Sequence, residues 1–260
     1  MSTPRNDYWW WAEGLYMVMP VMTKLYTLTA NPAYLDKLYE YIQKSDSIMY
    51  DTETGLYFRD GKYVYPAHKS ANGKKDFWAR GDGWVLAGLA KVLKDLPADY
   101  KHRGFFEDKY RRLADAVVAC QQPEGYWSRS MLDEAHAPGY EPSGTAFFTY
   151  GLLWGINNGY LNDSKYRDAA MKGWDYLSKI ALQKDGSIGY VQPIGEKAIP
   201  GQVVDRNSTS NFGTGAFLLA ACEYVRYLEK DGNDDRAYWV GLAYNMAEPV
   251  LKLSLIHISE

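Results

Sequence analysis

A unit of two helices recurs along this chain, and the repeat limits the possible folds more than any other feature. Each unit has a turn that contains glycine, then an apolar helix, a short loop and a more charged helix. The apolar helices are predicted to begin near Glu13, Asp82, Ser143 and Gly213, which lie 69, 61 and 70 residues apart. Because one such unit cannot bury its apolar face alone, the units must pack side by side.

Apolar residues at helical spacing set the approximate bounds of these helices. The leading helices are expected at residues 13–29, 83–94, 143–157 and 213–228, and their partners at 34–44, 108–121, 165–182 and 235–251. The leading helices are apolar nearly all round, as an inner ring covered on both sides requires, whereas the partners carry charges along one face. The pattern predicts an all-α toroid of helical hairpins; an open helical solenoid is the alternative.

Three segments depart from this repeat. Residues 56–65 alternate around a central Asp-Gly pair and favour a small β-hairpin. The first inner-type helix begins almost at once, with no earlier hairpin to pack against it. Residues 253–260 fit no earlier pattern and resemble translated vector sequence, so the toroid domain is assigned to residues 1–252 and residues 253–260 to a non-native tail.

The composition narrows the classes of function. The net charge is −3, which leaves no basic footprint for nucleic acid. The chain has 23 Tyr and 9 Trp against 8 Phe. Tyrosine and tryptophan join a flat apolar face to a polar tip, which suits the C–H faces and hydroxyl edges of sugars. A large helical protein also packs these residues at helix boundaries, so the aromatic content alone does not decide between the two readings.

Cysteine, histidine and hydropathy patterns indicate neither a metal site nor a membrane span. Cys120 and Cys222 lie in separate apolar helical segments and are expected to be buried free thiols. The 4 histidines lack metal-ligand spacing, and no apolar run reaches transmembrane length. We therefore expect a soluble chain, cytoplasmic or, if an export signal precedes it, periplasmic.

Several stretches carry a resemblance to a known family. The sequence reads YWWWAEGLYM at residues 8–17, WARGDGW at residues 78–84, PSGTAFFTYG at residues 142–151 and GTGAF at residues 213–217. The first two resemble the W-x-D-x-L-[FY]-M and W-x-R-G-N-G-W signatures of unsaturated glucuronyl and rhamnogalacturonyl hydrolases. The chain is thus identified as a member of glycoside hydrolase family 105, related to family 88, and as one truncated at its N-terminus.

This resemblance implies an (α/α)6 barrel of six helical hairpins, of which about four are present, with the active site where the inner helices begin. It also implies a glycoside hydrolase that removes a Δ4,5-unsaturated uronic acid from the non-reducing end of pectin-derived rhamnogalacturonan oligosaccharides. An acid protonates the double bond, water adds, and the hemiketal collapses to release the next sugar. This route requires no cofactor and no metal.

Glu13 stands at the position of the family's catalytic aspartic acid, behind three tryptophans. An apolar aromatic surrounding keeps a carboxyl protonated, as a general acid requires. The extra methylene of glutamate displaces the proton, and a carboxylate favoured by the helix dipole is the structural alternative. Arg80 is expected to pair with the substrate uronate in two parallel bonds, or else to cap a helix or bridge two hairpins.

The remaining candidates for substrate binding are aromatic, with one exception. Trp78 and Trp84 flank Arg80 and are expected to stack on the sugar, unless they only fill the turn. Asp82 replaces the family's asparagine, which puts a negative charge beside an anionic substrate and makes Arg80 its candidate partner. The candidates with a weaker signal, for which structural roles are the stronger reading, are Trp11, Tyr16 and Arg59. His68 and His136 are expected in solvated loops without a role.

Other readings stay open at this stage. The chain is also compatible with a non-catalytic carbohydrate-binding remnant, or with another (α/α)-toroid sugar enzyme such as an epimerase. A fragment that does not close into a ring would expose two apolar flanks and self-associate. The expected partner is an oligosaccharide with a terminal unsaturated uronate, and neither nucleic acid nor a membrane; the oligomeric state and the next sugar are left undetermined.

Overall fold

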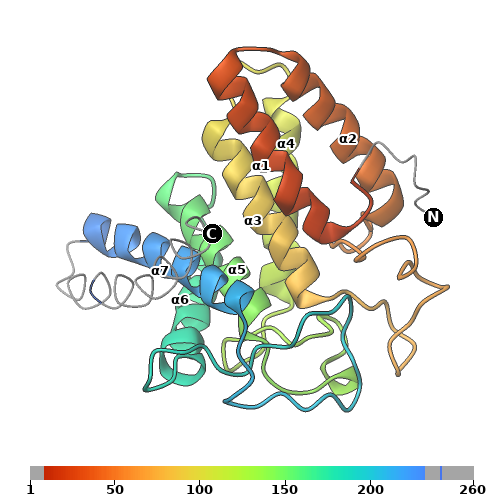
Figure 1. Ribbon diagram of the computed structural model, residues 1–260, viewed down its shortest axis with the longest axis vertical. Helices are drawn as coiled ribbons and strands as arrows, with labels where there is room; N and C mark the ends of the chain where they lie inside the picture. The colour runs from red at the N-terminus through yellow and green to blue at the C-terminus, as the bar shows by residue number, and fades with distance from the viewer. Residues whose placement is uncertain (1–8, 232–240, 242–260) are drawn as a thin grey trace, which may run out of the picture.

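The computed structural model describes residues 9–231 and residue 241, and in these residues the chain is helical with only isolated β-bridges. The elements are α1 (Ala12–Thr29), α2 (Ala33–Met49), α3 (Ala79–Asp95), α4 (Arg103–Ala119), η1 (Glu134–His136), α5 (Pro142–Asn157), α6 (Ser164–Tyr176), a π-helical turn η2 (Leu177–Ala181) and α7 (Asn211–Asp231) (Figure 1). No helix of this described part is long and apolar enough to cross a membrane.

The predicted two-helix repeat is confirmed as far as the described residues reach. The four leading helices are α1, α3, α5 and α7, and each begins within three residues of its predicted start. Three predicted partners correspond to α2, to α4, and to α6 with η2. The fourth predicted partner at residues 235–251 and the predicted tail at residues 253–260 lie outside the described residues.

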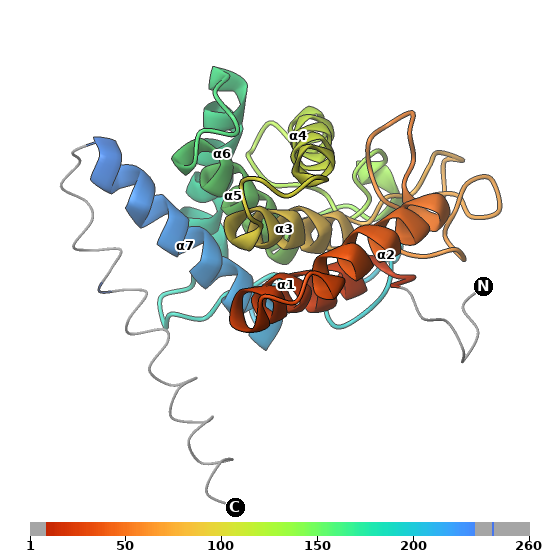
Figure 2. The ribbon, with the colours of Figure 1, turned by 90° about the horizontal axis from the view of Figure 1, so that it is seen from above.

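The helices form two layers. In the inner layer α1 packs on α3, α3 on α5, and α5 on α7, while α2, α4 and α6 cover α1, α3 and α5 from outside. Figure 2 shows α4 and α6 on the same side of α3 and α5. Two curved layers of hairpins are the arrangement of a partial (α/α) toroid, which confirms the all-α prediction.

Burial follows this layering except in the two inner helices at the ends of the arc. Nearly every residue of α5 is buried, whereas α2, α4 and α6 bury one face each. In α1, Met17, Val21 and Leu28 are 52%, 49% and 80% exposed, and in α7 Cys222 is exposed. The expectation that all leading helices are covered on both sides is therefore wrong for α1 and α7, because within the described residues they lie at the two ends of the arc.

Glycines let the inner helices approach closely. A β-carbon on Gly88 would lie 3.1 Å from Cα of Tyr16, so α3 touches the backbone of α1 at this point. A β-carbon on Gly83 would lie 3.0 Å from Cβ of Phe147 in α5. Because interiors are packed at crystal density, side chains at these positions would push the helices apart.

Three long loops, at residues 50–78, 120–141 and 182–210, return the chain from each outer helix to the start of the next inner helix. Their backbones are joined to those starts and to each other. The amide of Ala12 donates to the carbonyl of Arg59 at 2.8 Å, and the amide of Ala79 donates to that of Arg129 at 3.1 Å. The loops therefore form one connected layer over the beginning of the inner helices.

The predicted β-hairpin at residues 56–65 is wrong. Tyr57 forms an isolated bridge with Tyr50, and Asp60 forms one with Trp11. The alternating pattern is real, but this segment pairs with the ends of α1 and α2 instead of with itself. The expectation for the cysteines is half right, since both are free but only Cys120 is buried and Cys222 is exposed.

Candidate active site

The predicted site residues gather where the inner helices begin. Glu13 lies in the first turn of α1, and Arg80 and Asp82 lie in the first turn of α3. Ser143 occupies the equivalent turn of α5, and Phe212 that of α7. In Figure 1 this end of α1, α3 and α5 faces the long loops. The helix starts thus bring together residues that are far apart in the sequence.

Glu13 is bound by Arg59, which the loop at residues 50–78 carries. Nε of Arg59 donates to both carboxylate oxygens at 3.3 and 3.1 Å, and Nη2 donates to Oε1 at 3.1 Å. Both side chains are 15% exposed, so solvent reaches the pair. This end of the inner helices, where α1 and α3 begin beside the long loops, is the mouth of the site. A guanidinium bound side-on to a carboxylate fixes the orientation as well as the charge. Arg59, a weaker candidate from sequence, is therefore the direct partner of the predicted acid.

Two further carboxylates share the same guanidinium. Nη1 of Arg59 lies 2.6 Å from Oδ2 of Asp60 and 3.3 Å from Oε2 of Glu196. The hydroxyl of Tyr63 donates to Oε1 of Glu196 at 2.6 Å, and Nζ of Lys62 lies 3.6 Å from Oε2. The hydrogen bond from Tyr63, and then the charges of Lys62 and Arg59, lower the pKa of Glu196. The mouth of the site is thus a network of alternating charges.

Arg80 lies deeper and is already bound on all sides. Its guanidinium donates to the carbonyl oxygens of Gln192 at 2.6 Å and Pro193 at 2.7 Å, and the side chain is 2% exposed. The rings of Trp78 and Phe212 lie 4.6 and 4.4 Å from its guanidinium carbon. Arg80 thus anchors the loop at residues 182–210 to α3, and its contact with a uronate stays a prediction.

Glu141 is the fully buried carboxylate beside Arg80. It caps the first turn of α5, where its side chain accepts from the amide of Ser143 at 3.3 Å and from the amide of Gly144. Its Oε1 lies 3.9 Å from Nη1 of Arg80. A carboxylate at a helix N-terminus complements the helix dipole. The sequence analysis missed this role, although a Glu immediately before a Pro at the start of a helix is a local signal for it.

Asp82 does not pair with Arg80, so that expectation is wrong. Its side chain is fully buried, and Oδ1 accepts from the amide of Tyr57 at 2.8 Å. Oδ2 has no hydrogen-bond partner in the described part of the chain. Burial raises the pKa of Asp82 well above its ordinary value, and the bond from Tyr57 opposes this only in part. Asp82 therefore joins the loop at residues 50–78 to α3, a structural role that does not support the predicted substrate contact.

Asp82→Asn is expected to raise the free energy of unfolding at pH 7 by at least about 1 kcal/mol. The unfolded carboxyl titrates at about 4. Between that value and the raised pKa of the folded chain, the folded state holds a proton that the unfolded state has lost, so stability falls as the pH rises. Asparagine does not titrate, so the variant should lack this pH-dependent loss of stability. Denaturant unfolding at pH 5 and pH 8 measures the free energy of unfolding of both proteins. An equal increase at both pH values would contradict the titration argument.

The predicted aromatic residues divide into buried and accessible groups. Trp78 is 3% exposed and donates through Nε1 to Oε1 of Gln192 at 2.9 Å, so the expected stacking on a sugar is replaced by packing on Arg80. Trp84, 9% exposed, packs 4.7 Å from the ring of Tyr16. Trp11 and Tyr16 are partly exposed and remain available at the mouth.

His136 is buried, in contrast to the prediction of a solvated residue, whereas the side chain of His68 is 22% exposed. Nε2 of His68 lies 2.9 Å from Oδ2 of Asp76, and Nε2 of His136 lies 3.7 Å from the same oxygen. Oδ1 of Asp76 accepts from the hydroxyl of Ser130 at 2.6 Å. These contacts join the loops at residues 50–78 and 120–141. Within residues 9–231 and residue 241, no group of three His, Cys, Asp or Glu side chains is arranged to hold a metal ion.

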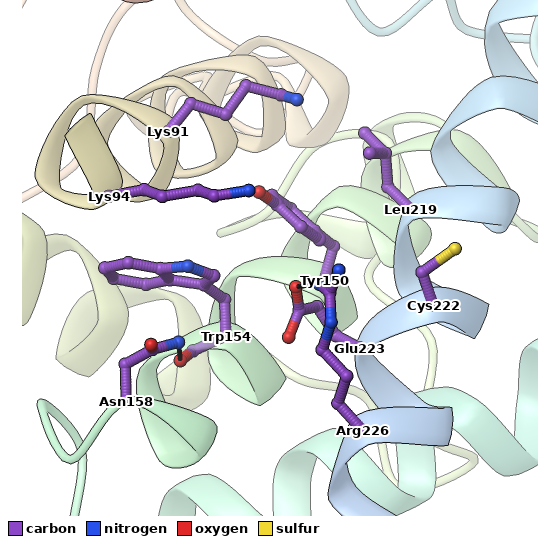
Figure 3. A pocket seen from close by; sticks show the side chains of 9 residues that line it. All are labelled: Lys91, Lys94, Tyr150, Trp154, Asn158, Leu219, Cys222, Glu223 and Arg226. Atoms are coloured by element: carbon purple, nitrogen blue, oxygen red, sulfur yellow. Dashed lines mark hydrogen bonds and ion pairs between the residues drawn. The ribbon is translucent and has the colours of Figure 1, made fainter.

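A separate cavity of about 450 Å³ lies between α3, α5 and α7, toward the other end of α3 (Figure 3). Its charged lining residues are Lys91 and Lys94 of α3 and Glu223 and Arg226 of α7, with Tyr150 and Trp154 of α5 beside them. Burial, and then the charge of Lys94, lower the pKa of Lys91. None of the predicted site residues lines this cavity.

The fold and the arrangement at the mouth define an (α/α)-toroid protein with a carboxyl group at the start of an inner helix. The model of Glycosyl Hydrolase Family 88 matches residues 3–228. The chain belongs to this family.

Individual relatives agree with this assignment. A protein of Formosa agariphila named unsaturated 3S-rhamnoglycuronyl hydrolase is 39% identical over 232 residues, which are 88% of this chain and 60% of the relative. A structure described as a polysaccharide lyase is 75% identical with a TM-score of 0.84, over 88% of this chain and 64% of that chain. A family 88 glycosyl hydrolase from Bacteroides vulgatus is 62% identical with a TM-score of 0.84, over 87% and 65%. The chain therefore spans less than two thirds of these proteins.

Four residues of the network around Arg59 were not predicted from sequence: Asp60, Lys62, Tyr63 and Glu196. Asp60, Lys62 and Tyr63 surround the glycine of the segment that was predicted to be a hairpin, where nothing distinguished them from turn and surface residues. Glu196 is 133 residues away from Tyr63. No local pattern in the sequence predicts a contact between residues so far apart along the chain.

Proposed function

We propose that this chain belongs to an enzyme that removes a Δ4,5-unsaturated uronyl residue from the non-reducing end of an oligosaccharide, with Glu13 as the acid. The observation that carries the proposal is the Glu13 carboxyl group in the first turn of α1, bound side-on by Arg59, in a family 88 chain. The name of the Formosa relative, unsaturated 3S-rhamnoglycuronyl hydrolase, supports a substrate that contains rhamnose and an unsaturated uronate. That the substrate derives from rhamnogalacturonan is a proposal that rests on the motif resemblance.

The proposed reaction requires one acid placed beside the double bond. Glu13, once protonated, gives its proton to C4 of the double bond, and positive charge develops on C5 and the ring oxygen. Water adds to C5 and returns a proton to the Glu13 carboxylate. The resulting hemiketal opens to a ketone, and the hemiacetal formed at C1 then releases the neighbouring sugar. In the structure Glu13 accepts hydrogen bonds from Arg59, so it must leave this pair, at least in part, to donate a proton.

Finer assignments rest on the same resemblance. We propose that the chain is closer to the rhamnogalacturonyl branch, family 105, than to the glucuronyl hydrolases, and that residues 1–252 form its share of the toroid. The greater length of the relatives supports the proposal that about two N-terminal hairpins complete the ring in the whole protein. Trp11 and Tyr16 are proposed to contact the sugar because both are partly exposed at the mouth.

A second candidate function is a polysaccharide lyase, because a structure 75% identical to this chain is described as one. A lyase removes the C5 proton of a uronate and expels the group at C4, which creates the double bond that the proposed hydrolase consumes. Both reactions act on a substrate that carries a uronate carboxylate, and Arg59 is a cation that can pair with it in either case. The hydrolase removes the conjugated double bond, whereas the lyase forms it.

The ultraviolet absorbance of that double bond therefore tests both functions in one assay. We expect it to fall when the chain is mixed with an unsaturated uronyl-rhamnose disaccharide. A rise on a saturated rhamnogalacturonan would instead assign the lyase function. No change with either substrate, in a chain whose circular dichroism shows it to be folded, would refute the proposed activity of this chain.

A further inference from the structure

Three donors converge on one carboxylate at the mouth. Tyr63 donates to Oε1 of Glu196 at 2.6 Å, while Arg59 and Lys62 lie 3.3 and 3.6 Å from Oε2. The three donors come from one short stretch of the loop at residues 50–78, whereas Glu196 comes from the loop at residues 182–210. Two cations and a hydroxyl around one carboxylate are the chemistry of a carboxylate-binding site. Arg59 is shared in this arrangement, since its Nη1 also lies 2.6 Å from Oδ2 of Asp60.

We propose that Arg59, Lys62 and Tyr63 form the subsite for the carboxylate of the substrate uronate, and that Glu196 occupies this subsite until substrate replaces it. The inference rests on the proposed function for the identity of the ligand. Without substrate, the Glu196 carboxylate occupies the place of the substrate carboxylate. With substrate, the three donors select sugars that carry a carboxylate.

The position of the subsite beside Glu13 matches the chemistry. In an unsaturated uronate the carboxylate carbon is bonded to C5, and C4, which must receive the proton, is only two bonds from that carbon. The carboxylate receptor and the acid must therefore be neighbours. Arg59 meets this requirement, since Nε and Nη2 bind Glu13 while Nη1 faces Glu196. A substrate carboxylate in the place of Glu196 would bring the double bond next to the acid.

Arg80 is the less suitable receptor. Its guanidinium donates to two main-chain carbonyls, lies between two aromatic rings and is 2% exposed. A uronate would have to displace these contacts and the loop that they anchor. The side chain of Arg59 is 15% exposed and is already bound to carboxylates.

Glu196 is the member of the network that is easiest to displace. Its side chain is 44% exposed, against 15% for Glu13 and 1% for Asp60. It lies near the tip of its loop, two residues from Ile194, which is 91% exposed. Exchange of one carboxylate for another leaves the three donors paired, and the displaced Glu196 carboxylate, which is already 44% exposed, is hydrated by solvent instead. An exposed ion pair holds a side chain only weakly, which favours exchange.

Binding of a non-reactive sugar tests the subsite without turnover. The probes are methyl galactosiduronic acid and its methyl ester, which lack the double bond, and the measurement is an NMR titration of the full chain. We expect the acid to bind more tightly than the ester. Tyr63→Phe and Lys62→Met should each weaken binding of the acid, by about 10-fold for the hydroxyl, with little effect on the ester. Glu196→Gln should strengthen binding of the acid by about 2- to 5-fold.

Matched controls separate the subsite from general charge effects. Lys69→Met removes a lysine of the same loop that stacks on Tyr65, and Glu53→Gln removes an exposed carboxylate paired with Lys75. Neither should alter the preference for the acid. Equal affinities for acid and ester, or a preference unaffected by Tyr63→Phe and Lys62→Met, would overturn the proposal, as would weaker binding by a folded Glu196→Gln variant.

The absorbance assay distinguishes this failure from failure of the proposed function. Preferential binding of the acid without any turnover would retain the subsite and reject the hydrolase. Turnover that is unchanged in Tyr63→Phe and Lys62→Met would retain the hydrolase and reject the subsite.

Discussion

Glu13→Gln is expected to lower the turnover number for an unsaturated uronyl disaccharide by about 10³-fold, within the range that general acids contribute. Glutamine keeps the size of the side chain and can still accept a hydrogen bond from Arg59, but it has no proton to give to C4. The loss should appear in kcat, since the uronate is held by other residues. Initial rates from the decay of the double-bond absorbance measure it.

Two comparisons make this result specific. Glu53→Gln makes the same chemical change at a site that is 80% exposed, and it should leave the rate unchanged. Glu13→Asp restores the carboxyl group in its shorter form and should retain more activity than Glu13→Gln, with a penalty of up to about 100-fold for a displacement on the order of 1 Å. A Glu13→Gln chain with the full rate would remove Glu13 from the mechanism and leave the acid to be sought elsewhere.

Arg80→Met is expected to lower the free energy of unfolding by about 3–5 kcal/mol, as is typical when one partner of a buried charge pair is removed. Methionine fills much of the same volume, but the carbonyl oxygens of Gln192 and Pro193 lose their donor. Glu141, which is fully buried, would also lose the cation 3.9 Å from its carboxylate. Chemical denaturation followed by circular dichroism gives the change in free energy directly.

A double variant identifies the source of that loss. If the unpaired Glu141 carboxylate accounts for part of it, Arg80→Met with Glu141→Gln should be more stable than the sum of the two single changes predicts. Arg111→Met removes a 43% exposed arginine on α4 and should change stability by no more than about 1 kcal/mol. A small loss at Arg80 combined with weakened binding of the uronate probe would return Arg80 to the role of substrate receptor.

The architecture was predictable from sequence because it depends on local periodicity and on a repeat. Apolar residues recur along α3 and α5 at helical spacing, and glycines precede or open the same helices in each unit. These signals predict helices, their order and their burial. They also predict that Glu13 and Asp82 lie at the starts of two neighbouring inner helices, and the structure places both in the first turn of such a helix.

Side-chain partners were not predictable in the same way, because they depend on loops from different hairpins. Arg59 binds Glu13 across 46 residues, and Tyr63 binds Glu196 across 133. The segment with Arg59 and Tyr63 alternates as a hairpin would, yet it follows the ends of α1 and α2, since these helices offer it unpaired backbone groups. The alternation predicts an extended segment, which is correct, but it does not predict that the segment pairs with the helix ends.

The sequence by itself thus determined the all-α repeat and the relation to family 88, and it singled out Glu13 as the proposed acid, since each is encoded in a contiguous stretch. Only the tertiary structure decided which arginine faces the mouth. Both arginines lie close to a helix start, but Arg80 is covered by a loop 112 residues further along the chain, whereas Arg59 stays accessible beside Glu13. Exposure and charge pairing depend on all the elements that meet at a point, and no local pattern in the sequence contains that information.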